Sequence, residues 1–334
     1  MISVRSSFTA VMVSPELIEG SNHRLFLFLF ISCIFCSCTG DLQSPIDGPS
    51  PKTPYILVLG VAQDAGFPQA GCKKECCRLA FRDKSIRKMV SCIALIDPIS
   101  KERWLFDATP DFKDQLFLMD SVAPYGKLDG IFLTHAHMGH YTGLLHLGKE
   151  VMNAKMIPVY VNPDMNEFLQ SHLPWEQLVR LENIDLQPLK YDTIVKLNER
   201  ISVKAFLVPH RSEISETYVY QIQMNGKKVI FIPDIDKWEK WDTDIRELVN
   251  QNDLLFLDAT FFKDGELPGR NMQEIPHPFV EESMKLFESL SAEGKKKIHF
   301  IHFNHTNPLL NDSSDACKQV KSAGFSVAEE GKIY

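Results

Sequence analysis

Three histidines within six residues carry the clearest chemical signal in the sequence. His135, His137 and His140 lie in the segment THAHMGH, directly after an apolar run over residues 130–134. Imidazole rings at this density are ligands that a zinc-class ion prefers. His135 and His137 can converge on one ion from an extended segment, and His140 can approach from the turn that follows. The segment predicts a metal site at the end of a strand, and a solvated histidine-rich loop is the alternative.

This pattern resembles the metallo-β-lactamase superfamily, whose hallmark is a strand that ends in HxHxDH. Here the motif reads HAHMGH, so Gly139 stands where that family usually has Asp. By resemblance, Asp107 in LFDATPDF would orient the histidine loop through hydrogen bonds. His210 in VPHRSEISE and His302 in FIHFNHTNP would be two further ligands. Asp234 in VIFIPDID would bridge two metal ions.

The resemblance implies a hydrolase that holds one or two divalent ions and attacks its substrate with a metal-bound hydroxide. Zinc is the first choice of metal, with iron and manganese as alternatives. The expected first ion has the ligands His135, His137 and His210, and the expected second ion has His140 and His302, with Asp234 between them. Because Gly139 removes one carboxylate, we expect a second ion that is weaker, differently held or absent. His305 is a further candidate ligand and Asp236 an alternative to Asp234, although both fit ordinary surface polar residues equally well.

His277 is the candidate proton donor. It lies in the segment IPHP, just before an amphipathic stretch over residues 279–291. In the phosphodiesterase relatives, a histidine in this stretch protonates the leaving group, and an imidazole titrates close to working pH. A structural histidine at a helix start is the alternative. His277 and Asp234 are therefore the candidate catalytic residues.

One branch of the superfamily resembles the chain more closely, namely the pyrroloquinoline quinone (PQQ) biosynthesis protein B-like proteins. The resemblance rests on YILVLGVAQDAGFPQAGC, TPDF, TGLL and FIHFNHTNPLL and spans residues 55–334. Three functions stay open. The first is a metal-dependent hydrolase of a phosphodiester or small ester, the second an iron-dependent redox or quinone-processing enzyme, and the third a non-catalytic metal-containing lipoprotein.

Cysteines form a second cluster in the segment GCKKECC, with Cys72, Cys76 and Cys77. Relatives carry a zinc-binding cysteine knuckle at this place, so a separate structural zinc is expected here, with Cys92 or a histidine completing the set. In an exported protein a disulfide within this group is the competing prediction.

The N-terminus predicts export. Residues 25–38 read LFLFLFISCIFCSC after Arg24, which fits the apolar core of a secretory signal. Cys38 follows a small residue and precedes a polar stretch, as in bacterial lipoproteins that are acylated on cysteine. We expect a leader and signal over residues 1–38, a flexible linker over 39–54 and the functional domain over 55–334. A buried N-terminal helix is the alternative. The expected location is the periplasmic side of a bacterial membrane or the cell surface, reached through the lipid anchor.

The remaining chain predicts an α/β fold that positions these residues. Ten apolar runs predict strands, and five amphipathic stretches predict helices between them. So many strands require two sheets, and we expect a four-layer αββα metallo-β-lactamase sandwich. The strands are expected at 55–61, 90–96, 103–106, 130–134, 157–161, 201–208, 217–223, 228–232, 254–257 and 297–303. The helices are expected at 165–172, 175–182, 242–250, 279–291 and 313–323.

Composition narrows the class of partner. The 334 residues contain 36 Lys+Arg and 43 Asp+Glu, for a formal net charge of -7. An acidic balance argues against a nucleic-acid partner, which would favour a basic excess. The 44% hydrophobic content also excludes a disordered chain. We therefore expect a small-molecule substrate, and oligomeric state stays open.

Overall fold

The computed structural model describes residues 51–211 and 213–334. The signal segment, Cys38 and most of the expected linker lie outside these residues. Within the described ranges, no helix combines the length and apolar character that a membrane crossing requires. The first strand of the described part of the chain begins at Tyr55.

A six-stranded sheet is formed by the first half of this part, with its strands in sequence order. The first three strands pair antiparallel, and the next three continue the sheet in parallel. The strands are β1 Tyr55–Gly60, β2 Cys92–Asp97, β3 Glu102–Phe106, β4 Gly130–Phe132, β5 Ile157–Val161 and β6 Ile184–Pro188.

A seven-stranded sheet follows and has the same arrangement. Its strands pair antiparallel from the first to the fourth and parallel from the fourth to the seventh, so the fourth strand takes part in both kinds of pairing. The strands are β7 Ile194–Lys196, β8 Ile201–Val208, β9 Thr217–Met224, β10 Lys227–Ile232, β11 Leu254–Asp258, β12 Ile298–Ile301 and β13 Ser326–Val327. The two sheets pack face to face, with side chains such as Ile56, Phe106, Val203 and Tyr220 in one buried cluster between them.

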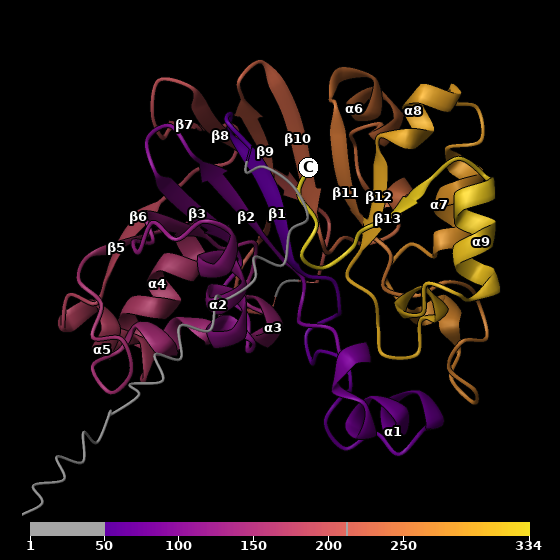
Figure 1. Ribbon diagram of the computed structural model, residues 1–334, viewed down its shortest axis with the longest axis horizontal. Coiled ribbons are helices and arrows are strands. Elements are labelled where there is room, and N and C mark those ends of the chain that lie inside the picture. The colour runs from indigo at the N-terminus through magenta and orange to yellow at the C-terminus, as the bar shows by residue number, and fades with distance from the viewer. Residues whose placement is uncertain (1–50, 212) are drawn as a thin grey trace, which may run out of the picture. The chain divides into compact units, whose positions relative to one another are not determined.

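Helices cover the outer face of each sheet (Figure 1). Buried side chains of α2, α4 and α5 pack on the first sheet, and those of α6, α7 and α9 pack on the second. The helices are α1 Glu75–Arg82, α2 Phe112–Val122, α3 Met138–Tyr141, α4 Pro163–Ser171, α5 Trp175–Arg180, α6 Ile245–Gln251, α7 Val280–Leu286, α8 Ala292–Lys296 and α9 Asp315–Ser322. The expected four-layer αββα sandwich is confirmed.

Burial on both faces explains why β1 is a continuous apolar run. Ile56 and Val58 belong to the cluster between the sheets, whereas Tyr55, Leu57 and Leu59 belong to the cluster under α2. Central strands of a layered α/β fold are covered on both sides, so they carry no polar alternation. The same apolar character made the ten strongest strands visible in the sequence.

Several weaker elements were missed by the sequence analysis. The strands β6, β7 and β13 are short, and β6 carries the half-buried polar residues Asp185 and Gln187. Helix α2 has buried residues at 112, 115, 119 and 122, a helical spacing that was overlooked because one of them is Gln115. The expected helix over 279–291 ends at Leu286, and a separate short α8 begins at Ala292.

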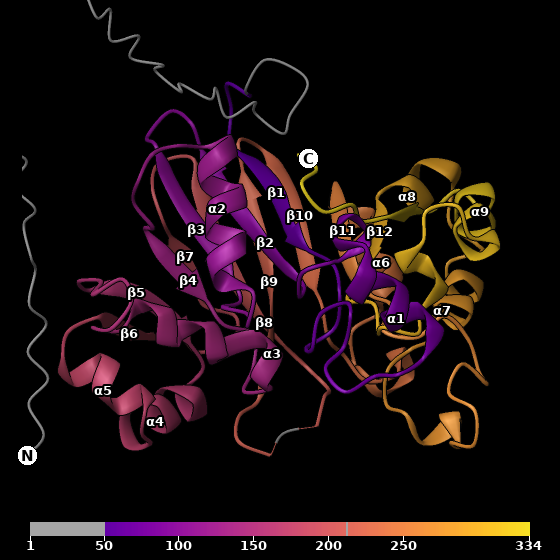
Figure 2. The same ribbon diagram turned by 60° about the horizontal axis from the view of Figure 1, so that its bottom comes forward.

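The candidate site residues lie just beyond strand ends. Asp107 directly follows β3, and His302 directly follows β12. The histidine loop comes shortly after β4. His210 follows the end of β8 by two residues, and Asp234 follows the end of β10 by two residues. Loops at the carboxyl ends of strands are the usual place for ligand sites in layered α/β folds. In the view of Figure 2, α3 lies below the strands β8 and β9. The fold thus gathers distant segments at one edge.

Candidate metal centre

Four donor atoms form a first group at this edge, from His135, His137, His210 and Asp234. The Nε2 atoms of His135 and His210 lie 3.4 and 3.3 Å from the Asp234 Oδ2 atom. The His137 Nδ1 atom lies 2.7 Å from His135 Nε2 and 3.3 Å from His210 Nε2. Zinc bonds of about 2 Å in a tetrahedron place ligand atoms about 3.3 Å apart, so the separations suit such an ion.

A second group shares the same Asp234 and adds Asp64, His140 and His302. The Asp64 Oδ1 atom lies 3.1 Å from His140 Nε2 and 3.5 Å from His302 Nε2. The Asp234 Oδ2 atom lies 3.9 Å from His140 Nε2. One carboxylate oxygen of Asp234 is therefore within reach of both groups, which is the geometry of a bridging ligand.

The ring nitrogen that points away from the centre has a partner in each of the five histidines. Carboxylates serve three of them: Asp107 contacts His140 Nδ1 at 2.7 Å, Asp236 contacts His210 Nδ1 at 3.2 Å, and Glu213 contacts His137 Nε2 at 3.2 Å. Hydroxyl groups serve the others, since Thr134 Oγ1 lies 3.0 Å from His135 Nδ1 and Thr260 Oγ1 lies 2.9 Å from His302 Nδ1. Outer partners of this kind fix the ring orientation of metal-binding histidines.

Asp107 braces the histidine loop at more than one point. Its Oδ1 atom accepts hydrogen bonds from the backbone N–H and the hydroxyl of Thr134, at 2.8 and 2.9 Å. Asp107 and His302 both adopt left-handed backbone conformations, with φ of 73° and 70°. Such conformations are uncommon for residues with a side chain and are often held in place at functional sites.

Two buried polar atoms in the centre have no hydrogen-bond partner among the described residues. They are Asp234 Oδ1 and His302 Nε2, in side chains that are 2% and 0% exposed. The Asp234 Oδ1 atom lies 3.1 Å from His277 Nδ1 without hydrogen-bond alignment. A buried donor or acceptor without a partner is costly, and a cation bound in the second group would engage His302 Nε2. The residues present therefore fit a metal centre.

Electrostatics keep the two central carboxylates ionised. Burial opposes their charge, but His277 and His210 outweigh it and hold the pKa of Asp234 well below its usual value. The hydrogen bond from His140 does the same for the pKa of Asp64. Burial, together with the neighbouring His140, lowers the pKa of His135 well below its usual value, so this ring is neutral. Burial opposes the charged ring in His140 and His210, but neighbouring carboxylates outweigh it and raise the pKa of both. These two rings would release a proton when a cation binds, because neutral imidazoles and ionised carboxylates are the binding forms.

Asp64 is the one donor that the sequence analysis did not single out. It follows β1 by four residues, in the segment AQDAG, and it has no spacing relation to the histidine motif. The only available sign was the loss of the usual Asp at Gly139, which leaves the second group one carboxylate short. Of the three expectations for the second ion (weaker, differently held or absent), this geometry favours an ion that is differently held, because a distant loop places a carboxylate beside the group.

Two further expectations are not supported by the geometry. His305 lies outside both donor groups, and its Nδ1 atom is 3.1 Å from Asn304 Oδ1, because the chain turns away after Phe303. Asp236 does not replace Asp234; its carboxylate contacts the outer nitrogen of His210 instead.

His277 lies beside the Oδ1 atom of Asp234, at 3.1 Å. Its Nδ1 atom lies 2.9 Å from Asp258 Oδ2. Burial disfavours the charged ring, but Asp258 and Asp234 outweigh it and raise the pKa of His277 well above its usual value. Because Nδ1 faces the carboxylates, Nε2 is the atom left for a substrate.

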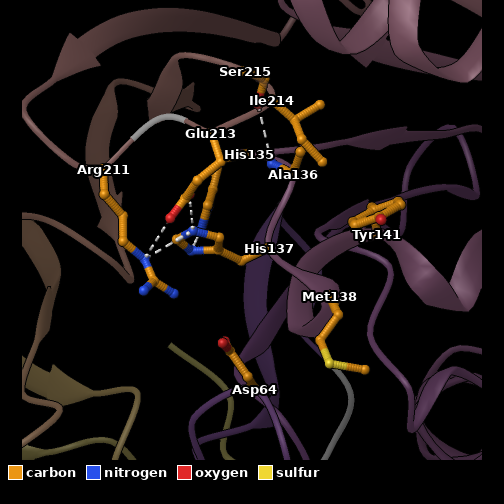
Figure 3. Close-up of a pocket in the computed structure, with 10 residues that line it drawn as sticks. All are labelled: Asp64, His135, Ala136, His137, Met138, Tyr141, Arg211, Glu213, Ile214 and Ser215. Carbon is orange, nitrogen blue, oxygen red and sulfur yellow. Dashed lines mark hydrogen bonds and ion pairs between the residues drawn. The ribbon is translucent and has the colours of Figure 1, made fainter.

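Two clefts adjoin the donor groups and meet at Arg211. The first has a volume of about 390 Å³, and Figure 3 shows the side chains of Asp64 and His137 that line it, with Arg211 and Glu213 nearby. The second has a volume of about 320 Å³ and is lined by His277 and by polar side chains. Among its described lining residues are two arginines, Arg211 and Arg270, and no carboxylate. An anionic group fits such a wall.

The cysteine cluster forms a separate donor group away from the histidines. The sulfur atoms of Cys72, Cys76 and Cys77 lie within 4.8 Å of one another, and all three are free thiols. Backbone N–H groups of Gln69 and Lys74 donate to Cys77 and Cys72 at 3.3 and 3.4 Å. Burial raises the pKa of the Cys77 thiol to about 12, so a thiolate there needs a nearby cation.

The disulfide expected as the competing arrangement is not formed in the described structure. Cys92 does not complete the cysteine group, because its side chain is buried under the first sheet and its sulfur lies 3.5 Å from the Asp107 carbonyl oxygen.

Residues 102–303 match the family described as the β-lactamase superfamily domain. Among curated relatives, the coenzyme PQQ synthesis protein B of Acinetobacter baylyi is 26% identical over 308 residues, covering 83% of this chain and 98% of that protein. The protein of the same name from Klebsiella pneumoniae strain 342 is 28% identical over 309 residues, covering 83% of this chain and 96% of that protein.

Solved structures show the same fold. Zn²⁺-bound PqqB from Methylobacterium extorquens superposes with a TM-score of 0.70 at 22% identity, covering 84% of this chain and 99% of that one. A diphosphatase of the PhnP family gives a TM-score of 0.58 at 20% identity, covering 84% and 96%. Human tRNase Z, short form, gives 0.53 at 17% identity, covering 84% and 98%. The resemblance found in the sequence, including the PQQ biosynthesis protein B branch, is confirmed.

Proposed function

Because the chain belongs to the β-lactamase superfamily domain family, we propose that it is a metal-dependent hydrolase of a phosphodiester or another small anionic ester. The observation that carries this proposal is the pair of donor groups joined by one Asp234 oxygen. Their inward-facing atoms lie close to one another, and the outer nitrogens of the histidines are held by partners. When bound, zinc-class ions would supply Lewis acidity and an activated water near neutral pH.

Different residues of the chain would bind the metal ions, donate a proton and bind the substrate. His135, His137 and His210 would hold one ion, and Asp234 would bridge to a second ion beside His140 and His302. His277 would give a proton to the leaving group through Nε2, because Nδ1 is held by Asp258. Arg211 and Arg270 would attract and orient an anionic group in the adjoining cleft.

Zinc is the proposed metal, with iron and manganese as alternatives. The set of imidazole and carboxylate donors suits all three ions, and geometry alone does not choose between them. The relative whose structure carries zinc, PqqB of Methylobacterium extorquens, supports zinc as the first ion to test.

The test joins metal analysis to hydrolysis. The full-length chain, purified and loaded with Zn²⁺, is expected to retain stoichiometric metal and to cleave a bis-aryl phosphodiester. The double variant His135→Ala with His137→Ala should lose metal and turnover, while His172→Ala, on the exposed end of α4, should retain both. Absence of stoichiometric metal in the wild-type chain would refute the proposal.

A second candidate function comes from the relatives named coenzyme PQQ synthesis protein B. On this alternative the chain would hold iron and process a quinone precursor by redox chemistry. Iron-dependent aerobic turnover of a quinone precursor, without cleavage of the phosphodiester, would favour it. The third candidate, a non-catalytic metal-containing lipoprotein, would bind metal and turn over neither substrate.

For the N-terminus, we propose acylation at Cys38 and anchoring to a bacterial membrane. The proposal rests on the apolar run before Cys38 and the polar stretch after it. In a bacterial host the wild-type chain is expected in the membrane fraction, and Cys38→Ala is expected to remain unacylated. Equal lipid labelling of both chains would exclude this cysteine as the site.

A further inference from the structure

We propose that Asp64 replaces the missing motif carboxylate as a ligand of the second ion, and that Gly139 is glycine because the Asp64 loop occupies the space beside it. The inference rests on the proposed function only in requiring a metal centre. It concerns a residue before the stretch that matches the family, residues 102–303. The second group would then hold Asp64, His140, His302 and the shared Asp234.

The position of the Asp64 carboxylate is the first observation. Its Oδ1 atom lies 3.1 Å from His140 Nε2 and 3.5 Å from His302 Nε2, so one carboxylate oxygen is close to both rings of the second group. The His302 Nε2 atom is fully buried and has no hydrogen-bond partner among the described residues. Since Nδ1 of His302 is already engaged by Thr260, the unpartnered nitrogen is the one aimed at this group.

The space around Gly139 is the second observation. A Cβ atom on Gly139 would lie 2.4 Å from the Asp64 Cα atom and 2.6 Å from its Oδ1 atom, far inside van der Waals contact. The backbone of Gly139 is not left-handed, so its conformation does not demand glycine. Glycine inside a helix costs about 1 kcal/mol relative to alanine. Space for the Asp64 loop is therefore the reason for glycine here.

The backbone of the loop is held firmly against the second sheet. The Gln63 N–H donates to the Phe303 carbonyl at 2.8 Å, and the Phe303 N–H donates to the Val61 carbonyl at 2.8 Å. A tight turn follows, in which the Gly66 N–H donates to the Gln63 carbonyl at 2.7 Å. Because Phe303 directly follows His302, these bonds fix the carboxylate of Asp64 relative to the His302 ring. A ligand held in this way is preorganised for an ion.

Metal titration tests the inference without using activity. The full-length chain is stripped of metal and titrated with Co²⁺, whose d–d absorption reports each bound equivalent. In the wild-type chain we expect two equivalents at the histidine centre, besides the one expected at the cysteine group. In Asp64→Asn the second equivalent of the histidine centre should be weakened at least 10- to 100-fold, roughly the loss known for supporting residues. The control Asp315→Asn removes an exposed carboxylate on α9 and should titrate like wild type. Identical second-site titration of wild type and Asp64→Asn would overturn the inference.

The variant Gly139→Asp distinguishes the space argument from an argument based on the sequence motif alone, because the two predict opposite effects on binding of the second ion. Gly139→Asp rebuilds the family motif in the sequence, so a simple motif argument expects tighter binding of the second ion. The geometry instead predicts weaker binding and a lower Tm, because the new Cβ collides with the Asp64 backbone. Adding Asp64→Gly should not rescue it, since the Cα atom remains. Tighter binding by Gly139→Asp with an unchanged Tm would contradict the proposal.

Failure of this inference is distinguishable from failure of the proposed function. If phosphodiester cleavage is absent but Asp64→Asn still loses the second equivalent, the ligand assignment stands and the hydrolase proposal falls. If cleavage is present and Asp64→Asn binds both ions normally, the hydrolase proposal stands and the ligand assignment falls.

Discussion

The Nδ1 atom of His277 lies 2.9 Å from the Oδ2 atom of Asp258, at the end of β11. Asp258 is itself held by the backbone N–H groups of Ile235 and Thr260, at 3.1 and 2.8 Å. The carboxylate therefore cannot rotate away from the ring without losing several bonds. This places Asp258 as a positioning residue and leaves His277 Nε2 toward the cleft.

A proton donor matters most when the leaving group is poor, which makes His277 testable by choice of substrate. His277→Gln should lower kcat about 10²- to 10⁴-fold for an alkyl leaving group and much less for a nitrophenyl leaving group. Asp258→Asn should show the same dependence on leaving group with a smaller loss. Steady-state kinetics on both substrates measure it, with His172→Gln as the control. An equal loss on both substrates would mean that His277 does not donate a proton.

Arg270, which lines the second cleft, should bind the negative charge of a phosphodiester substrate. Arg270→Gln is expected to raise KM for an anionic phosphodiester by roughly fivefold at low salt, because an exposed ion pair contributes up to about 1 kcal/mol. The kcat should be unchanged, and the effect should shrink at high salt. Arg180→Gln, on α5, is the matched control. An identical rise in KM for a neutral ester would argue against charge recognition.

The cysteine group should hold a structural zinc. Cys77→Ser is expected to lower bound zinc by about one ion per chain and to reduce the Tm, because three thiolates lie within reach of one ion. Metal analysis and thermal unfolding check this, with Cys317→Ala as a control for a buried thiol outside the group. Loss of two titratable thiols on mild oxidation, with zinc content unchanged, would favour the disulfide instead.

Asp97 and Arg200 link the two sheets and should make stability depend on pH. The Asp97 Oδ2 atom accepts from Arg200 Nη2 at 2.8 Å and from Asn198 at 3.1 Å. Burial opposes the charge, but Arg200 outweighs it and lowers the pKa of Asp97. Because the folded-state pKa lies below the unfolded value, this stability is present above about pH 4 and is lost as pH falls through the folded pKa.

A double-mutant cycle measures this link. Asp97→Asn and Arg200→Gln are each expected to cost about 1–3 kcal/mol at pH 7, as for hydrogen bonds to charged groups. The coupling energy between them, from urea unfolding of the two single variants and the double variant, should fall toward zero in acid. A coupling energy that is the same at neutral and acid pH would show that the ion pair does not cause the dependence.

The sequence by itself determined the strongest parts of the fold and most of the centre. The ten apolar runs are strands. Those buried on both faces, such as β1 and β2, carry a continuous apolar signal, and β8 carries the alternating signal of a strand with one buried face. His135, His137 and His140 could be named from their spacing at a strand end, and the resemblance to the superfamily added His210, Asp234 and His302. Weak strands such as β6, with its half-buried polar residues, lack that signal and were missed.

Tertiary structure alone decided what completes the second donor group. In the sequence, Gly139 is an absence, and Asp64 is one acidic residue among many, 75 positions away. Only the packing of the β1 loop against His302 and α3 brings that carboxylate to the histidines. The sequence shows which residues follow a strand. It does not show that the Asp64 loop lies beside Gly139, because that contact depends on how the two loops pack in three dimensions. The same reason applies to His305 and Asp236, which the sequence offered as possible ligands or ordinary polar residues alike: they lie near the centre in sequence, but neither joins a donor group.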